Sequence, residues 1–201
     1  MQRQWIRLLM IFLVAIGVAI AGANLLASSP NIDYSTGYQT TDSTSTTASL
    51  VEFPADYGQQ FFQYTTVDCP NSRIVRKMFV NQESLEAIAT SQIVPSGTVI
   101  VMETHSAQKG DGGQLVPSQL NNVFIREKRT GWSVHPDSGE WQSAWYSPSG
   151  SRVSSGQSSC ISCHTGVRDR DYVFTLPALI SAAQTGQLQR QQTEFGTSVC
   201  R

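Results

Sequence analysis

Four stretches of the chain predict β-strands, because β-branched and aromatic residues are concentrated in them and turn residues separate them. Val, Ile, Thr, Phe, Tyr and Trp pack well on the pleated surface of a sheet, whereas Gly, Pro, Asn, Asp and Ser favour turns. The predicted strands are 73–80, 98–103, 122–128 and 141–146. A polar, hairpin-like loop is predicted from His105 through the glycines at 110–113. The pattern predicts a mainly antiparallel sheet.

Three other stretches predict helices, since their apolar residues recur every three or four positions. They are 54–64, 82–90 and 177–184. Pro54 suits the first turn of the first helix. Tyr57, Phe61 and Tyr64 would then share one face of that helix, which we interpret as core. Strands with flanking helices, and no internal repeat, indicate an α+β fold and not an all-helical one.

One charged residue interrupts an apolar face of the first predicted strand. Arg76 alternates with Ile74, Met78 and Val80, so the four side chains point to the same side of the strand. Two interpretations are open. Arg76 either lies near an edge and extends to water, or it points its charge into a pocket.

Residues 1–27 have the pattern of an export signal. Arg3 and Arg7 precede an unbroken apolar run at 8–20, and small residues at 21–23 offer a cleavage site. Basic residues only before the run keep the N-terminus cytoplasmic and send the rest outward. With two leucines just beyond it, the run approaches the ~20 residues that span a bilayer. The segment is therefore a cleaved signal peptide or an uncleaved membrane anchor, and the remainder is expected to be periplasmic or otherwise extracytoplasmic.

The remaining chain divides into a linker and one domain. Residues 28–49 are mostly Ser, Thr, Asp, Gly and Asn, a composition typical of a flexible tether. Residues 50–201 are of the right length for one domain, at about 100–200 residues per domain. The net charge of the chain is −1, so there is no electrostatic argument for a nucleic-acid partner.

The chemistry of the chain centres on the stretch S-C-I-S-C-H-T at 159–165. Two cysteines separated by two residues and followed by histidine are the attachment motif of c-type haem. Cys160 and Cys163 would bond to the two vinyl groups of one porphyrin, and His164 would be the proximal ligand of the iron. A redox dithiol would be expected next to a βαβ pattern, and a zinc site would need a second pair of ligands. Neither pattern is visible, and covalent haem attachment agrees with export.

Two cysteines lie outside the haem motif, Cys69 and Cys200. In an oxidising compartment, such a pair favours a disulfide. The bond would join the early part of the domain to its C-terminus. The alternative of two separate thiols stays open, because a sequence does not supply the Cα separation that a disulfide requires.

A set of motifs occurs in a fixed order along most of the domain. They are F-P-x-x-Y at 53–57, R-K-M-F-V-N-Q-E-S at 76–84, G-T-V-I-V at 97–101, E-W at 140–141, C-x-x-C-H at 160–164 and Y-V-F-T at 172–175. With this set, residues 53–184 resemble the cytochrome P-460 family, which includes the β-sheet cytochromes c′. The haem motif is common to all c-type cytochromes, whereas the ordered set is much more specific.

The resemblance implies a β-rich domain that holds one haem, with histidine on one side of the iron and an open site on the other. It also implies a homodimer, a small diatomic or nitrogen-oxide ligand, and a redox partner protein for members that turn over. Members of the family oxidise hydroxylamine or nitric oxide, or bind nitric oxide without turnover.

The resemblance also assigns residues near the haem. Arg76 matches an arginine that lines the distal pocket of the family. Catalytic members carry a lysine bonded to the porphyrin, and Met102 stands at that place here. A thioether cannot form the same nitrogen–carbon bond. Catalytic members also use a distal carboxylate, and Ile125 or Arg126 stands near that place, with Glu127 beside it.

Three functions follow as hypotheses. The first is a five-coordinate haem protein that binds nitric oxide, with Arg76 as donor and Phe124 restricting access. The second is an oxidoreductase for hydroxylamine or nitric oxide, against which the missing lysine counts. The third is an electron carrier whose sixth ligand is Met102, His105 or His135, since Met or His often completes such haems. We interpret Met102 as a core residue and both histidines as exposed loop residues, which favours the first hypothesis.

Overall fold

The computed structural model describes residues 48–133, 135–154, 156–193 and 198–200. They belong to one compact unit, Ser43–Arg201. The predicted signal or anchor at 1–27, and nearly all of the predicted linker at 28–49, lie outside the described residues. No helix in the described ranges is long and apolar enough to cross a membrane.

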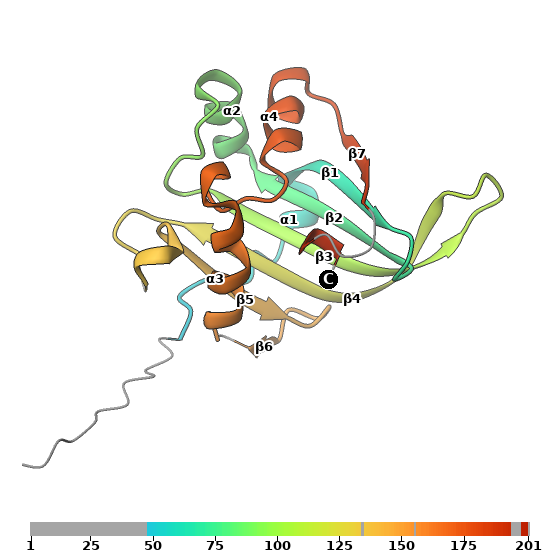
Figure 1. Cartoon of the computed structure of the whole chain (residues 1–201), viewed down its shortest axis with the longest axis horizontal. Coiled ribbons are helices and arrows are strands. Elements are labelled where there is room, and N and C mark those ends of the chain that lie inside the picture. The colour runs from blue at the N-terminus through green and yellow to red at the C-terminus, as the bar shows by residue number, and fades with distance from the viewer. Residues whose placement is uncertain (1–47, 134, 155, 194–197, 201) are drawn as a thin grey trace, which may run out of the picture. The chain divides into compact units, whose positions relative to one another are not determined.

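A seven-stranded sheet with the order β6-β5-β4-β3-β2-β1-β7 forms the centre of the described chain (Figure 1). Neighbouring strands are antiparallel, except that β7 runs parallel to β1. The α+β fold with a mainly antiparallel sheet is therefore confirmed. The strands are β1 Phe61–Cys69, β2 Ile74–Asn81, β3 Val99–Lys109, β4 Leu115–Lys128, β5 Trp141–Tyr146, β6 Arg152–Ser154 and β7 Gln189–Gln192.

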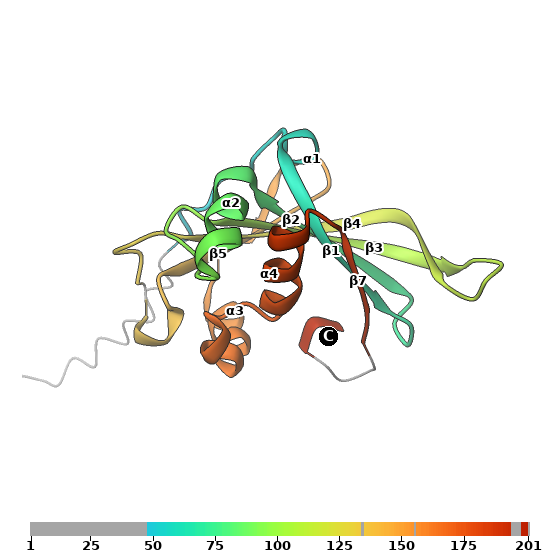
Figure 2. The ribbon, with the colours of Figure 1, turned by 90° about the horizontal axis from the view of Figure 1, so that it is seen from above.

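Helices cover both faces of this sheet. Figure 2 shows α1 on one side and α3 and α4 on the other. The helices are α1 Tyr57–Gln60, α2 Gln82–Ser91, α3 Ser158–His164 and α4 Leu176–Thr185, with 3-10 turns η1 Pro136–Ser138, η2 Thr165–Arg170 and η3 Ser198–Cys200. The predicted helices at 82–90 and 177–184 are confirmed. Helix α4 begins next to Pro177 and ends at Gly186, whose φ of 67° suits glycine.

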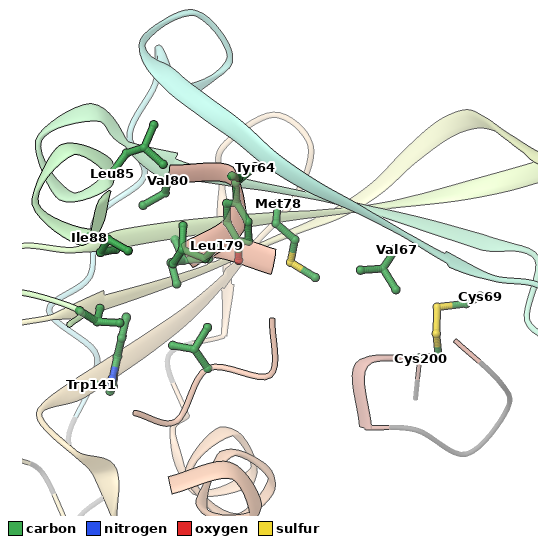
Figure 3. Packing of buried hydrophobic residues seen from close by; sticks show 14 residues of the cluster. Tyr64, Val67, Cys69, Met78, Val80, Leu85, Ile88, Trp141, Leu179 and Cys200 are labelled. Carbon is green, nitrogen blue, oxygen red and sulfur yellow. A yellow bond between two sulfur atoms is a disulfide. The ribbon is translucent and has the colours of Figure 1, made fainter. Parts of the chain in front are cut away.

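Two apolar clusters occupy the two faces of the sheet. The first packs α2 and α4 against β1 and β2, through residues such as Leu85, Leu179 and Tyr64 (Figure 3). The second lies on the opposite face, where Tyr57 of α1 packs near Phe79. Each face therefore has its own core.

The first predicted helix is wrong over most of its length. Helix α1 covers only Tyr57–Gln60, and the chain continues as strand β1 from Phe61. Tyr57 and Tyr64 consequently pack in different clusters and do not share a face. The last six residues of β1 are all buried, so the strand lacks the polar–apolar alternation that marks a half-exposed strand. Phe, Tyr, Thr and Val at this position nevertheless favour a strand.

The predicted strands at 73–80, 98–103, 122–128 and 141–146 are confirmed, but two of them are longer than expected. Strands β3 and β4 extend as a hairpin through the region predicted as a polar loop, which shrinks to 110–114. Strands β6 and β7 were not predicted. Both are short and polar, and β6 is fully exposed, so hydrophobic periodicity gives no signal there.

A disulfide closes the domain. Cys69 at the end of β1 bonds to Cys200 in η3, with a Cα–Cα distance of 5.6 Å and a sequence separation of 131 (Figure 3). The predicted pairing is confirmed. The bond attaches the C-terminal segment, including Val199, to the sheet face that carries α4.

Candidate functional site

A cavity of about 250 Å³ lies between the face of the sheet that carries α4 and the segment from α3 to α4. Its floor contains a row of side chains from three neighbouring strands: Met78, Met102 and Phe124 face it from β2, β3 and β4. Trp145 continues the row on β5. The opposite wall is formed by α3 and by residues 173–175, with Val199 at one side. The cavity is therefore an apolar slot between a sheet and a short helix.

Helix α3 brings the two cysteines of the haem motif to this slot. Residues three apart lie on the same face of a helix, and both Cys160 and Cys163 line the cavity as free thiols. The helix is attached to β5 at its start, where the backbone N–H of Ser143 donates to the side-chain oxygen of Gln157 at 3.0 Å. The motif thus presents two sulfur nucleophiles to one side of the slot.

His164 ends α3 and also lines the cavity. Its Nδ1 lies 2.7 Å from the carbonyl oxygen of Tyr172, and its ring packs against Phe174 with 4.9 Å between centroids. Burial, with a further contribution from nearby Arg126, lowers the pKa of His164 to about 3. The imidazole is therefore neutral at neutral pH. With Nδ1 donating to the carbonyl, Nε2 is the nitrogen left to act as a ligand.

A tight turn places the Tyr172 carbonyl on His164. Asp171 and Tyr172 both adopt positive φ, 50° and 60°, which is costly for residues other than glycine. An ion pair of 2.6 Å between Lys128 and Asp171 holds this turn to β4. Gly139 makes room for it, because a Cβ there would lie 2.1 Å from the Tyr172 ring. Strain of this kind persists where surrounding contacts enforce it.

Arg76 contributes a positive charge to the cavity wall. Its Nη1 lies 3.8 Å from the sulfur of Met102, within reach of a weak hydrogen bond. Burial lowers the pKa of Arg76 below its usual value. The sequence left open whether Arg76 extends to water or points into a pocket. In the structure it lines the cavity, as the second interpretation predicts.

A second arginine, Arg126, contacts His164 directly. Its Nη1 lies 2.7 Å from His164 Nδ1 and donates to the Tyr172 carbonyl at 2.5 Å. Its Nε donates to Ser143 Oγ at 3.2 Å, and its guanidinium lies over the Trp141 ring at 4.7 Å. Burial lowers the pKa of Arg126 to about 10, so the side chain is still charged at neutral pH. The family resemblance puts Ile125 or Arg126 near the place of the distal carboxylate of catalytic members; both residues line the cavity, and Arg126 is the one that contacts His164.

Of the other residues that the sequence analysis considered near the haem, some line the cavity and some do not. The interpretation of His105 as an exposed loop residue is wrong, because it is buried in strand β3, with Nε2 2.7 Å from Glu103. His135 is exposed near Asp137, and neither histidine lines the cavity. Of the three candidate sixth ligands, Met102 alone lines the cavity. Glu127 is buried beside Arg129 on the other side of β4 and also does not line the cavity.

Trp145 is an aromatic residue beside the cavity that the sequence analysis did not single out. Phe124 stacks on Trp145, with 5.5 Å between ring centroids, and Trp145 donates from Nε1 to Asn122 at 3.0 Å. Trp145 is one of the large apolar side chains that are exposed. Period two along β5 would have placed it on the same face as Trp141 and Ser143. Together, Phe124 and Trp145 form an aromatic edge to the slot.

Comparison with known proteins agrees with the motif order. The family model described as cytochrome P460 matches residues 54–175, a range that contains strands β1 to β6, helix α3 and nearly every residue that lines the cavity. A search of curated proteins found no match.

Proposed function

This chain belongs to the cytochrome P460 family, which implies a haem cofactor, and we propose that it is an exported mono-haem cytochrome that binds nitric oxide or a related small nitrogen ligand. The observation that carries the proposal is the composition of one cavity. Its walls combine the C-x-x-C-H helix with a charged arginine and an apolar floor.

The residues of the cavity fit a covalently bound haem. Cys160 and Cys163 would each form a thioether with one vinyl group, and Nε2 of His164 would be the axial ligand. The Tyr172 carbonyl fixes the ring orientation and the tautomer that such a ligand needs. A haem bound here would supply an iron with an open coordination position for a small ligand.

The chain's own residues would determine which ligand is retained. Arg76 offers N–H donors and a fixed positive charge, which favour a bound species with negative charge on its outer atom. Met78, Met102 and Phe124 provide an apolar floor that disfavours large or charged molecules. These features favour a small, weakly polar ligand such as nitric oxide.

One observation supports a second candidate function. Met102 lies on the cavity wall, and a thioether is a common sixth ligand in electron-transfer haems. The contact with Arg76 gives the sulfur another partner, which favours the open site. Oxidation of hydroxylamine or nitric oxide is less favoured, because no described residue that lines the cavity is a carboxylate that could act as a base.

The setting of the protein follows from its N-terminal pattern and its family. We place the haem domain in the periplasm or another extracytoplasmic compartment, released after cleavage or attached through residues 1–27. We propose a homodimer, and a redox partner protein if the haem is turned over.

Replacing Arg76 by leucine is expected to weaken binding of nitric oxide about ten-fold or somewhat more. A hydrogen bond to a charged group contributes about 1.5–3 kcal/mol, and about 1.4 kcal/mol corresponds to a factor of ten in affinity. The measurement is the dissociation rate of nitric oxide from the reduced protein, together with the stretching frequency of the bound ligand. Haem attachment and folding should be unchanged.

Lys77→Leu is the matched control, because Lys77 alternates with Arg76 along β2 and points to the other face of the sheet. It should leave both quantities unchanged. The electron-carrier function would replace this proposal if the resting protein has a low-spin spectrum that persists in Arg76→Leu and disappears in Met102→Leu.

A further inference from the structure

The environment of His164 contains a positive charge that a haem-binding motif does not require. Three groups meet at one point: His164 Nδ1, the Tyr172 carbonyl oxygen and Nη1 of Arg126. Nδ1 and the carbonyl are 2.7 Å apart, Nη1 and the carbonyl 2.5 Å, and the two nitrogens 2.7 Å. The carbonyl can accept from both nitrogens, because it has two lone pairs.

The geometry leaves two ways to distribute the hydrogens. If Nδ1 of His164 carries its hydrogen and donates to Tyr172, Nε2 keeps a lone pair for a metal. If Nδ1 accepts from Arg126, a neutral ring must carry its hydrogen on Nε2, which removes that lone pair. A ligating His164 therefore requires the first arrangement, in which Arg126 is a neighbouring cation and its hydrogen bond goes to the carbonyl.

The charge of Arg126 is held in place by neutral groups. Its Nε donates to Ser143, and its guanidinium packs on the face of Trp141. No ion pair with a carboxylate is found for Arg126 within the described ranges, and the nearby Asp171 pairs with Lys128 at 2.6 Å. Once Cys160 and Cys163 form thioethers, their sulfurs carry no charge either. The cation therefore acts on His164 with little compensation, at short distance and away from bulk water.

We propose that Arg126 is a positioning residue that holds the Tyr172 carbonyl against His164 through its hydrogen bond and, through its charge, limits how strongly this histidine donates electrons to the haem iron. This inference rests on the haem site proposed above. Metal-bound histidines commonly donate their second N–H to a carboxylate or carbonyl, which raises their basicity. Here the carbonyl is present, but the cation beside it opposes its effect. A nearby positive charge also disfavours the oxidised iron, so Arg126 raises the reduction potential.

Substitution of Arg126 by a neutral residue of similar reach tests this. In Arg126→Gln, the reduction potential should fall and the iron–histidine stretching frequency of the reduced protein should rise. Arg126→Lys keeps the charge and should stay close to the wild-type protein in both measurements. Arg129→Gln is the control on the same stretch of chain, because Arg129 is exposed; it should change neither quantity.

A haem-loaded Arg126→Gln protein with an unchanged or higher potential, or with a lower stretching frequency, would overturn the inference. So would an Arg126→Lys protein that shifts as far as Arg126→Gln, since the charge would then not be the cause. If Arg126→Gln fails to fold, Arg126→Met, which keeps an apolar stem beside Trp141 but carries no charge, should shift both quantities in the same direction. No shift in that variant would also count against the inference. Failure of the proposed function is distinct, because the wild-type protein itself would then retain no haem after denaturation.

Discussion

Replacement of both Cys160 and Cys163 by alanine is expected to abolish covalent retention of haem. The two thiols line one cavity and are the described free cysteines, so no other sulfur there can form the thioethers. The wild-type protein, exported through a cytochrome c maturation system, should show the added mass of one haem. That mass should survive acid–acetone extraction. In the double variant, mass spectrometry should find the polypeptide alone.

The control for this experiment is the Cys69→Ser, Cys200→Ser pair, which removes two cysteines but leaves the haem motif intact. Covalent haem should remain on any of this protein that is exported and folded. Haem that extracts freely from the wild-type protein would contradict the assignment of the motif.

Loss of the Cys69–Cys200 disulfide is expected to be the largest single effect on stability. The bond closes a loop that spans 131 residues. In the chain-entropy model, constraining so long a loop in the unfolded state stabilises the protein by about 4–5 kcal/mol. The Cys69→Ser, Cys200→Ser variant should therefore unfold at a much lower urea concentration, and its free energy of unfolding should fall by about that amount.

Thiol labelling tests the bond itself. Unfolded but unreduced protein, with Cys160 and Cys163 either bonded to haem or replaced, should contain no reactive thiol. Labelling of two thiols under these conditions would refute the disulfide. Val67→Ala is a useful comparison for stability, because it removes buried core atoms from the same strand without touching the bond.

The parts of the fold that the sequence predicts are those where one face of an element differs from the other. In β2, Arg76 and Met78 share one face by period two, and the structure places both on the cavity wall. Strand β1 was not predicted, because burial on both of its faces removes the alternation of polar and apolar residues along it. Phe61 and Tyr64 of this strand, together with Tyr57 before it, could then be mistaken for the stripe of a helix, and the helix prediction is wrong for both strand residues.

The candidate site was predictable to the extent that its residues are close in sequence. Cys160, Cys163 and His164 form a local motif whose chemistry follows from its spacing. Arg126 could be assigned to a strand, but not to a contact with His164. That contact depends on the turn at Asp171 and Tyr172, where two residues adopt positive φ. Such a turn has no signal in the sequence, because neither residue is glycine.

The most direct test of the account is the absorption spectrum of the reduced wild-type protein before and after addition of nitric oxide. We predict a high-spin, five-coordinate spectrum that changes completely on addition of nitric oxide, because in the proposed site His164 would be the one axial ligand from the protein and the side near Arg76 would be left for nitric oxide. A red-shifted Soret band before addition would reveal a cross-link and favour the oxidoreductase function. A low-spin spectrum that nitric oxide does not change would contradict the account.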